Sequence, residues 1–71
     1  MARGICVQIG KRIRFLRIRK GWTQTILADH AGLTREHLSE LENGHKEIGI
    51  MALDRIIRAM DVTWVKFFED F

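Results

Sequence analysis

The chain has 71 residues, of which 46% are hydrophobic and 30% are charged, and its formal net charge is +3. This length fits one small domain, which excludes a two-domain enzyme with a substrate cleft between its halves. No apolar run approaches the roughly 20 residues of a membrane helix, and the N-terminus lacks the pattern of a secretory signal. The single Cys6 excludes an internal disulfide and fits a reducing compartment. We therefore expect a cytoplasmic protein without a membrane partner.

Positive charge is concentrated near the N-terminus. Seven Lys and Arg residues precede the first acidic residue, Asp29, whereas residues 29–71 carry five basic and nine acidic residues. A basic block of this kind favours a polyanion such as nucleic acid or an anionic membrane, or it is a solvated helix face. The charge pattern leaves these interpretations open until a fold motif is found.

Glycine and threonine divide the chain into helical segments. Gly21, Gly32 and Gly44 each follow a stretch with helical periodicity and suit the left-handed position after a helix. The residues at the expected N-cap positions are Thr23, Thr34 and Thr63. No alternation of β-branched and polar residues is long enough to predict a strand. The pattern predicts an all-α protein with helices at about residues 7–20, 24–31, 35–43, 50–60 and 64–70.

Apolar residues recur at helical spacing within these segments, and we interpret them as core. The stripe of the first segment consists of Ile5, Ile9, Ile13 and Leu16. The corresponding residues of the last two segments are Leu53, Ile56, Ile57, Met60, Trp64, Phe67 and Phe68. Three further apolar residues of the first helix, Val7, Phe15 and Ile18, lie away from its stripe. They are either scattered surface residues or a second interface.

The segment from Gln24 to Asn43 has the spacing of a helix-turn-helix. Its two short helices are separated by three residues, so they cross steeply, and Gly32 provides the residue that tolerates positive φ at the turn. Ala28, one turn earlier, is small enough for close approach of the helices. The aliphatic positions of the pattern are filled by Leu27, Leu33, Leu38 and Leu41. A helix-turn-helix is therefore predicted at about residues 23–44.

With these motifs the chain resembles the Cro and cI repressor type of DNA-binding domain, the XRE family. The resemblance runs from Ile9 to Phe68 and implies a single domain over residues 1–71 with the five-helix, lambda-repressor-like fold. The segments that carry it are Ile9–Arg14 with Leu16-Arg17, Gly21–Gln24, Ala31–Arg35 and Leu38–Gly44. The compact length and Phe67-Phe68-Glu69 also resemble the restriction–modification controller proteins of this family. The implied function is a sequence-specific transcriptional regulator that binds a palindromic operator as a homodimer.

The resemblance also implies roles for individual residues, with the helix at about residues 34–43 reading double-stranded DNA. The expected base contacts are Arg35, Glu36, Ser39 and Glu40, because Arg can bind guanine and Glu can accept from cytosine. The expected phosphate contacts are Gln24, Arg14, Thr23, His37, Asn43, Gly44 and Lys46. Arg17 and Glu42 resemble the partly buried ion pair that links the first and third helices in this family.

The acidic character of the reading helix departs from what DNA binding favours. Glu36, Glu40 and Glu42 face one Arg35 in this segment, and an acidic reading surface repels phosphate. Arg17 reduces this repulsion if it neutralises Glu42. The strength of this repulsion therefore depends on whether Glu42 points towards Arg17 or towards the reading surface.

A homodimer is expected through the last helix and the adjoining end of the fourth. The residues expected at that interface are Met51, Val65, Phe68 and Phe71. The alternative function is a protein-interaction module, such as an antitoxin that binds a partner protein and its own operator. The chain has no phosphate-binding loop, nucleophile elbow or acid–base pair, and its histidines lack the i, i+4 spacing of metal ligands. We expect no enzymatic activity, metal, cofactor or small-molecule ligand.

Overall fold

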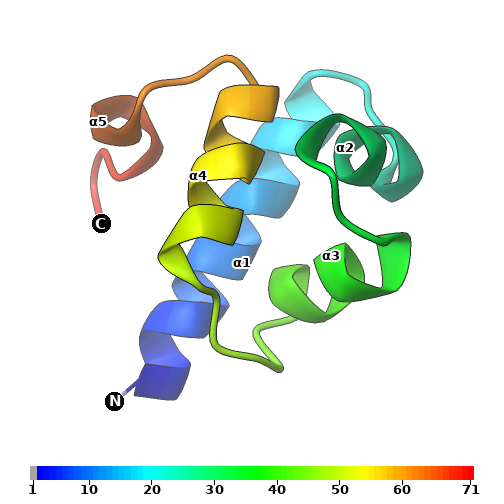
Figure 1. Ribbon diagram of the computed structural model, residues 1–71. Coiled ribbons are helices and arrows are strands. Elements are labelled where there is room, and N and C mark those ends of the chain that lie inside the picture. Colours follow the sequence, from blue (N-terminus) through cyan, green and yellow to red (C-terminus); the bar gives the residue numbers. More distant parts are fainter. Residues whose placement is uncertain (1) are drawn as a thin grey trace.

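The computed structural model describes residues 2–71, and these residues form five helices and no strand. The helices are α1 (Ala2–Arg19), α2 (Gln24–Ala31), α3 (Arg35–Glu42), α4 (Ile50–Ala59) and α5 (Trp64–Phe67) (Figure 1). In Figure 1, α2 and α3 lie on one side of α1, and α4 and α5 lie in front of it and on the other side. The predicted all-α fold of five helices is confirmed.

The ends of the first and last helices differ from the prediction. Helix α1 begins at Ala2 rather than at about residue 7, because nothing in the first residues interrupts the helical backbone. Helix α5 ends at Phe67 rather than at about residue 70. Asp70 has a φ of +64°, a left-handed conformation that cannot continue the helix. The remaining helix ends agree with the prediction to within one residue.

The predicted caps define the ends of the short helices. Thr23, Thr34 and Thr63 each accept a hydrogen bond from the backbone N–H three residues later, with N···Oγ1 distances of 3.2, 3.0 and 3.1 Å. Gly32 ends α2 with a φ of +70°, and the next residue, Leu33, donates its N–H to the carbonyl of Ala28 at 2.9 Å. This arrangement sets the sharp turn between α2 and α3.

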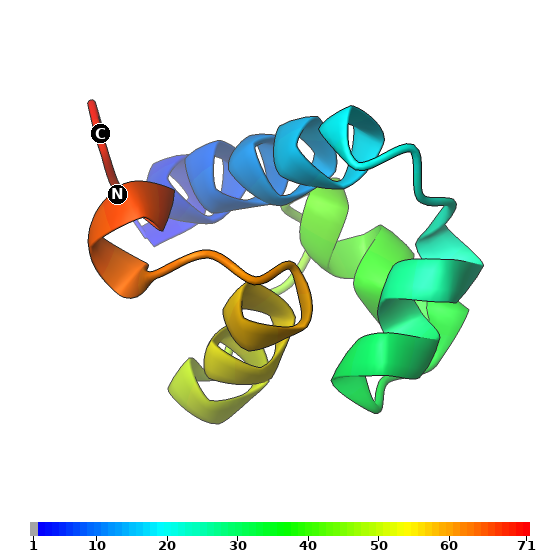
Figure 2. The same cartoon turned by 90° about the horizontal axis from the view of Figure 1, so that it is seen from above.

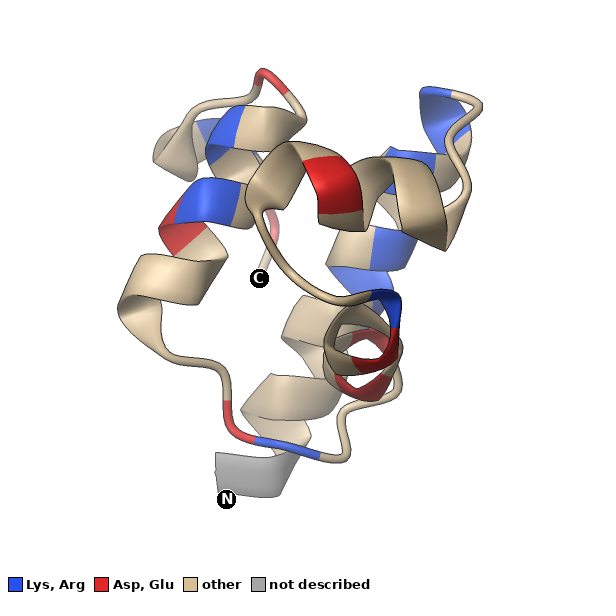
Figure 3. Ribbon diagram, turned by 45° about the vertical axis from the view of Figure 1, so that its right-hand side comes forward, with Lys and Arg blue, Asp and Glu red and all other residues tan. Residues whose placement is uncertain are grey.

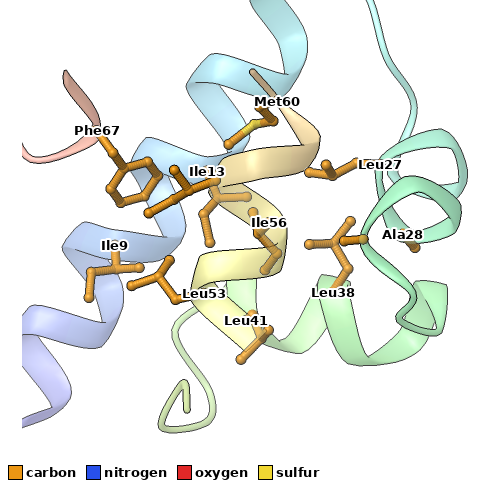
Figure 4. Packing of buried hydrophobic residues seen from close by; sticks show 12 residues of the cluster. Ile9, Ile13, Leu27, Ala28, Leu38, Leu41, Leu53, Ile56, Met60 and Phe67 are labelled. Atoms are coloured by element: carbon orange, nitrogen blue, oxygen red, sulfur yellow. The ribbon is translucent and has the colours of Figure 1, made fainter. Parts of the chain in front are cut away.

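All five helices contribute to one hydrophobic core (Figure 4). Its buried members are Ile9, Ile13, Leu27, Ala28, Ala31, Leu38, Leu41, Leu53, Ile56, Ile57, Met60 and Phe67. Ile5 was expected in this core, but its side chain is 44% exposed. The first turns of α1 extend past the other helices (Figure 1). Cys6, one residue after Ile5, is buried.

Helix α1 contacts α3 and the loop after it at two glycines, Gly10 and Gly44. A Cβ atom on Gly10 would collide with the backbone carbonyl oxygens of Leu41 and Glu42, so only glycine allows this approach. Gly44 lies against Val7, whose Cγ2 would be 2.8 Å from an added Cβ. Val7 is therefore half-buried and is not a free surface residue, unlike the other two apolar residues outside the α1 stripe.

Candidate nucleic-acid interface

Helix α3 buries one side and exposes the residues expected to contact bases. Leu38 and Leu41 pack into the core, whereas Arg35 and Glu36 in the first turn are exposed. Ser39 and Glu40, four residues later, are half-buried and follow the first pair on the same side of the helix. The structure therefore brings the four residues together on the outer side of α3.

The starts of α2 and α3 lie close together beside this surface. Gln24 is the first residue of α2 and Arg35 is the first residue of α3, and Arg35 Nη1 lies 3.5 Å from Gln24 Oε1. The first N–H groups of a helix carry partial positive charge and attract phosphate. Two helix starts and one guanidinium therefore converge at the edge of the α3 surface.

A buried ion pair fixes α3 to the rest of the domain. Arg17 Nε lies 2.6 Å from Glu42 Oε2, and Arg17 Nη2 lies 3.0 Å from Glu42 Oε1. The Arg17 and Glu42 side chains are 10% and 1% exposed. Arg17 also donates to the carbonyl of Trp22 at 2.8 Å, and Gln24 Nε2 donates to Glu42 Oε1 at 3.0 Å. The ion pair expected from the family resemblance is present, and it joins α1, α2 and α3.

The charge of the α3 surface is less acidic than the sequence suggests. Glu42 points inward to Arg17 and leaves the surface. Glu40 Oε1 lies 3.2 Å from Lys46 Nζ, and Glu36 Oε2 lies 3.8 Å from Arg35 Nη2. Figure 3 shows the acidic residues of α3 near the basic residues of α1. The predicted repulsion of phosphate is therefore reduced, although the exposed pairs contribute little stability.

The residues expected at phosphates differ in exposure. Arg14, Asn43 and Lys46 are exposed. Thr23 is also exposed and uses its hydroxyl to cap α2, whereas His37 is half-buried. Gly44 is buried, and its N–H donates to the carbonyl of Leu41 at 3.1 Å. Gly44 therefore has no free donor for a phosphate in this conformation.

The expected dimer residues lie in two different environments. Met51 and Val65 are 78% and 81% exposed. Met51 lines a shallow hollow together with Trp64, the neighbour of Val65 in the chain. Phe71 instead packs edge to face against Phe68, with ring centroids 4.9 Å apart. The hollow also contains Ile50, which is 71% exposed and which the sequence interpretation did not single out.

Asp54 connects α4 to α5 beside that hollow. Its carboxylate accepts hydrogen bonds from Trp64 Nε1 at 2.7 Å and from Arg58 Nε at 2.9 Å. The Trp64 hydrogen bond, followed by the Arg58 hydrogen bond and charge, lowers the pKa of Asp54 below its ordinary value. These hydrogen bonds fix α5 relative to α4, and with it the exposed Val65 relative to Ile50 and Met51.

The sequence interpretation also missed the role of Arg12. Its Nη1 and Nη2 donate to the carbonyls of Phe67 and Glu69 at 2.6 and 2.9 Å, and its guanidinium lies 4.9 Å from the centre of the Phe71 ring. Arg12 therefore attaches the C-terminal segment to α1. No local signal reveals this contact, because the carbonyl partners are more than 50 residues away and any residue type can provide them.

Other classes of site have little support in the part of the chain that the structure covers. Among residues 2–71, no three His, Cys, Asp or Glu side chains gather as metal ligands. His30 stacks on Trp22, with ring centroids 4.6 Å apart, and its Nδ1 lies 2.9 Å from the carbonyl oxygen of Ile26. None of the helices described here is long and apolar enough to cross a membrane.

Comparison with known proteins identifies relatives of the whole five-helix unit. A competence pilus inhibition repressor from Acinetobacter baylyi is 36% identical over 62 residues, which cover 87% of this chain and 56% of that protein. An uncharacterized helix-turn-helix transcriptional regulator from Sinorhizobium medicae is 32% identical and is covered to 48%. The chain thus spans about half the length of the curated relatives that it matches.

Solved structures match the fold over nearly the whole chain. The restriction-modification controller protein C.AhdI from Aeromonas hydrophila superposes with a TM-score of 0.87 and 29% identity, covering 92% of this chain and 98% of its own. The controller protein C.Esp1396I, solved as a tetramer with its natural 35 base-pair operator, has a TM-score of 0.86 and 31% identity, covering 90% and 84%. Residues 13–67 match the model of a family described as Helix-turn-helix. The chain therefore belongs to the helix-turn-helix family, and its resemblance to the XRE type and to controller proteins is confirmed.

Proposed function

We propose that this protein is a sequence-specific, DNA-binding transcriptional regulator that binds a palindromic operator as a homodimer through α3. The observation that carries the proposal is the exposed first turn of α3, which lies beside the start of α2 and is fixed from behind by the buried Arg17–Glu42 pair. The repressor and controller relatives support the same function. The protein acts by binding rather than by catalysis, in the cytoplasm that holds the DNA of a prokaryotic cell.

The surface around α3 supports a division between base reading and positioning. Arg35 and Glu36 project from the first turn, where a helix inserted in the major groove reaches base edges. Ser39 and Glu40 continue that face. The exposed Arg14, Thr23, Asn43 and Lys46 flank α3, where contacts to phosphates set the register without reading sequence. Gln24 and His37 complete the proposed phosphate set from partly buried positions.

The exposed apolar residues on α4 and α5 support the proposed homodimer. Met51 and Val65 are the most exposed large apolar side chains in the described part of the chain, and Ile50 adds to them. Burying this area against a second copy about a two-fold axis stabilises the pair. Two copies of α3 related in this way read half-sites about 34–36 Å apart, which gives a palindromic operator.

Selection from random DNA followed by titration tests the assignment of roles. The protein is used to select a preferred operator, and binding to that operator and to scrambled DNA is then measured at two salt concentrations. Arg35→Ala should lose about 1–3 kcal/mol on the operator and relax preference at one base pair per half-site. Arg14→Ala should weaken binding to both DNAs by a similar factor and reduce the salt dependence. Lys11→Ala removes one exposed positive charge from α1 and serves as the matched control.

Two outcomes would contradict the proposal. If Arg35→Ala weakens operator and scrambled DNA equally, α3 does not read bases. If sedimentation at tens of micromolar shows a monomer, and adding operator DNA does not bring two copies together, the proposed homodimer is wrong. In the expected case, Val65→Asp shifts the wild-type dimer towards monomer and weakens operator binding, while the far-UV circular dichroism spectrum shows that the helices remain folded.

A further inference from the structure

Helix α1 presents a second surface that the proposed DNA contacts do not use. Phe15 and Ile18 are each 55% exposed, and Lys11 and Arg19 beside them are also exposed. We call these four residues the outer face of α1. Gly10 and Arg17 of α1 contact α3, and at about 100° per residue Phe15 lies roughly 140–160° around the helix from them. The centre of the outer face therefore points away from the reading helix.

The arrangement of the helices leaves this surface open. In Figure 2, α1 runs along one edge of the molecule and the other helices lie on one side of it. Two adjoining hollows border the outer face, between α1 and the C-terminal segment, and both are lined by Arg12, Phe15 and Asp70. One hollow continues to Arg19, Lys66 and Glu69, and the other continues to Lys11. A groove thus runs beside the exposed Phe15, with the cations of α1 along one side and the carboxylates of Glu69 and Asp70 along the other.

A neighbouring part of α1 already binds the C-terminal segment of the chain. Residues 67–71 read Phe-Phe-Glu-Asp-Phe, an acidic segment with aromatic side chains. Arg12 holds this segment through two backbone carbonyls and lies over the ring of Phe71. Further along the helix, the guanidinium of Arg19 lies 5.5 Å from the centre of the Phe15 ring. The outer face therefore repeats the pairing of a guanidinium with an aromatic ring where the ring remains more than half exposed.

We propose that the outer face of α1 is a docking surface for an acidic segment of another protein, anchored by an aromatic or large aliphatic side chain. Phe15 and Ile18 offer apolar contact at the centre, and Lys11 and Arg19 provide a cationic rim. In protein interfaces, buried apolar side chains at the centre contribute most of the binding energy. Charged side chains at the rim guide association and set the orientation of the partner. Residues 1–28 contain no acidic side chain, so nothing on α1 itself neutralises the rim.

Three other occupants fit this surface less well. A second copy of the chain would bring two cationic faces together, which repel each other across a two-fold axis. Double-stranded DNA would cover the exposed Phe15 and Ile18 with phosphates that cannot pair with them. A membrane surface requires a long apolar helix face, whereas α1 offers two large apolar side chains here. The charge and the apolar centre together favour an acidic peptide.

A labelled peptide provides the test. The probe is a fluorescein-labelled peptide, Glu-Asp-Phe-Glu-Asp-Leu-Phe-Glu-Asp, and its binding to the intact protein is followed by fluorescence anisotropy at low and high salt. We expect saturable binding that weakens with salt, and amide shifts in NMR spectra that centre on the outer face. Phe15→Ser/Ile18→Ser should weaken binding about tenfold or more, and Lys11→Glu/Arg19→Glu should weaken it at least as much. Arg58→Glu, a charge reversal on α4, should leave it unchanged.

The controls separate this proposal from its alternatives and from DNA recognition. All altered side chains are exposed, and melting curves check that each variant folds. Phe15→Ser/Ile18→Ser should bind the selected operator as tightly as the wild type, so this surface and the proposed regulator function fail independently. The proposal is overturned if a peptide with Ser in place of Phe and Leu binds equally well, or if Arg58→Glu weakens binding as much as the outer-face variants. Binding of scrambled DNA or phosphatidylserine vesicles that depends on Phe15 and Ile18 would also overturn it.

Discussion

Replacing Arg17 with Met removes the cation that faces Glu42 and leaves a carboxylate with 1% of its side chain exposed. Of the three hydrogen bonds that Glu42 accepts, only the bond from Gln24 remains. Breaking a buried pair by removing one partner costs about 3–5 kcal/mol, because the other charge stays buried without compensation. A core of this size supplies only about 3–5 kcal/mol in total. Arg17→Met should therefore be largely unfolded at room temperature.

Urea and thermal unfolding from low temperature, followed by the fluorescence of Trp22 and Trp64, measure this loss. A domain of 60–100 residues loses roughly 4–8 °C of Tm per kcal/mol, so the Tm should fall by at least about 12 °C. The double variant Arg17→Met/Glu42→Leu removes both charges and should recover at least half of the loss, since an apolar pair of similar volume replaces the ion pair. Salt at 1 M should change the wild-type stability little, because the pair is shielded from solvent.

The result that would refute this reasoning is a loss below about 1 kcal/mol for Arg17→Met, the value typical of an exposed pair. A double variant that is less stable than the single variant would also contradict it. In either case, Arg17 and Glu42 would not depend on each other as the partners of a buried ion pair do.

Three further changes test the packing, the caps and the charge of the domain. Gly10→Ala should destabilise the fold by about 1–3 kcal/mol in urea unfolding, because the new Cβ meets backbone carbonyls, whereas Gly4→Ala has nothing within 4 Å and should stabilise α1 by about 0.5–1 kcal/mol; equal effects would contradict the close approach of α1 and α3. Thr34→Ala should cost about 1 kcal/mol in the same assay through loss of the α3 cap, and a neutral result would rule out that capping role. Because the folded-state pKa of Asp54 is lowered from 3.8, its contribution is present above that pH and is lost as pH falls through the folded value. Stability measured from pH 5 to pH 2 should therefore fall less steeply in Trp64→Phe than in the wild type, and identical pH profiles would show that this hydrogen bond has no such effect.

The sequence was most informative where a local rule determines the structure. The three Thr caps and the left-handed Gly32 follow from the hydrogen-bonding needs of helix ends and from the steric freedom of glycine, so they could be placed from the sequence alone. For the same reason, both ends of α2 could be predicted correctly from the helix-turn-helix spacing. Arg17 and Glu42 were found through a family pattern, since no local rule pairs residues that are 25 positions apart.

The sequence was least informative where a contact depends on the assembled fold. Ile5 fits the apolar stripe of α1, but the stripe extends beyond the helices that could cover it. Arg12 looked like one more member of a basic block, although its guanidinium binds the backbone of the C-terminal segment. Carbonyl acceptors have no sequence signature. Gln24 was expected at a phosphate, and only the coordinates reveal that it also contacts Glu42.

The glycine contact between α1 and α3 has a consequence for how such a protein can change its target. The position of α3 depends on Gly10 against backbone carbonyls and on inward-facing residues, and none of these is exposed. Of Arg35 and Glu36, only Arg35 contacts this framework, through its exposed hydrogen bond to Gln24. If α3 reads DNA as proposed, exchanging these two residues leaves the helix in place while altering the chemical groups that it offers to bases. Within the eight residues of α3, the side chains that hold the helix in place differ from those proposed to contact bases. Surface substitutions could therefore change the preferred operator during evolution without destabilising the fold.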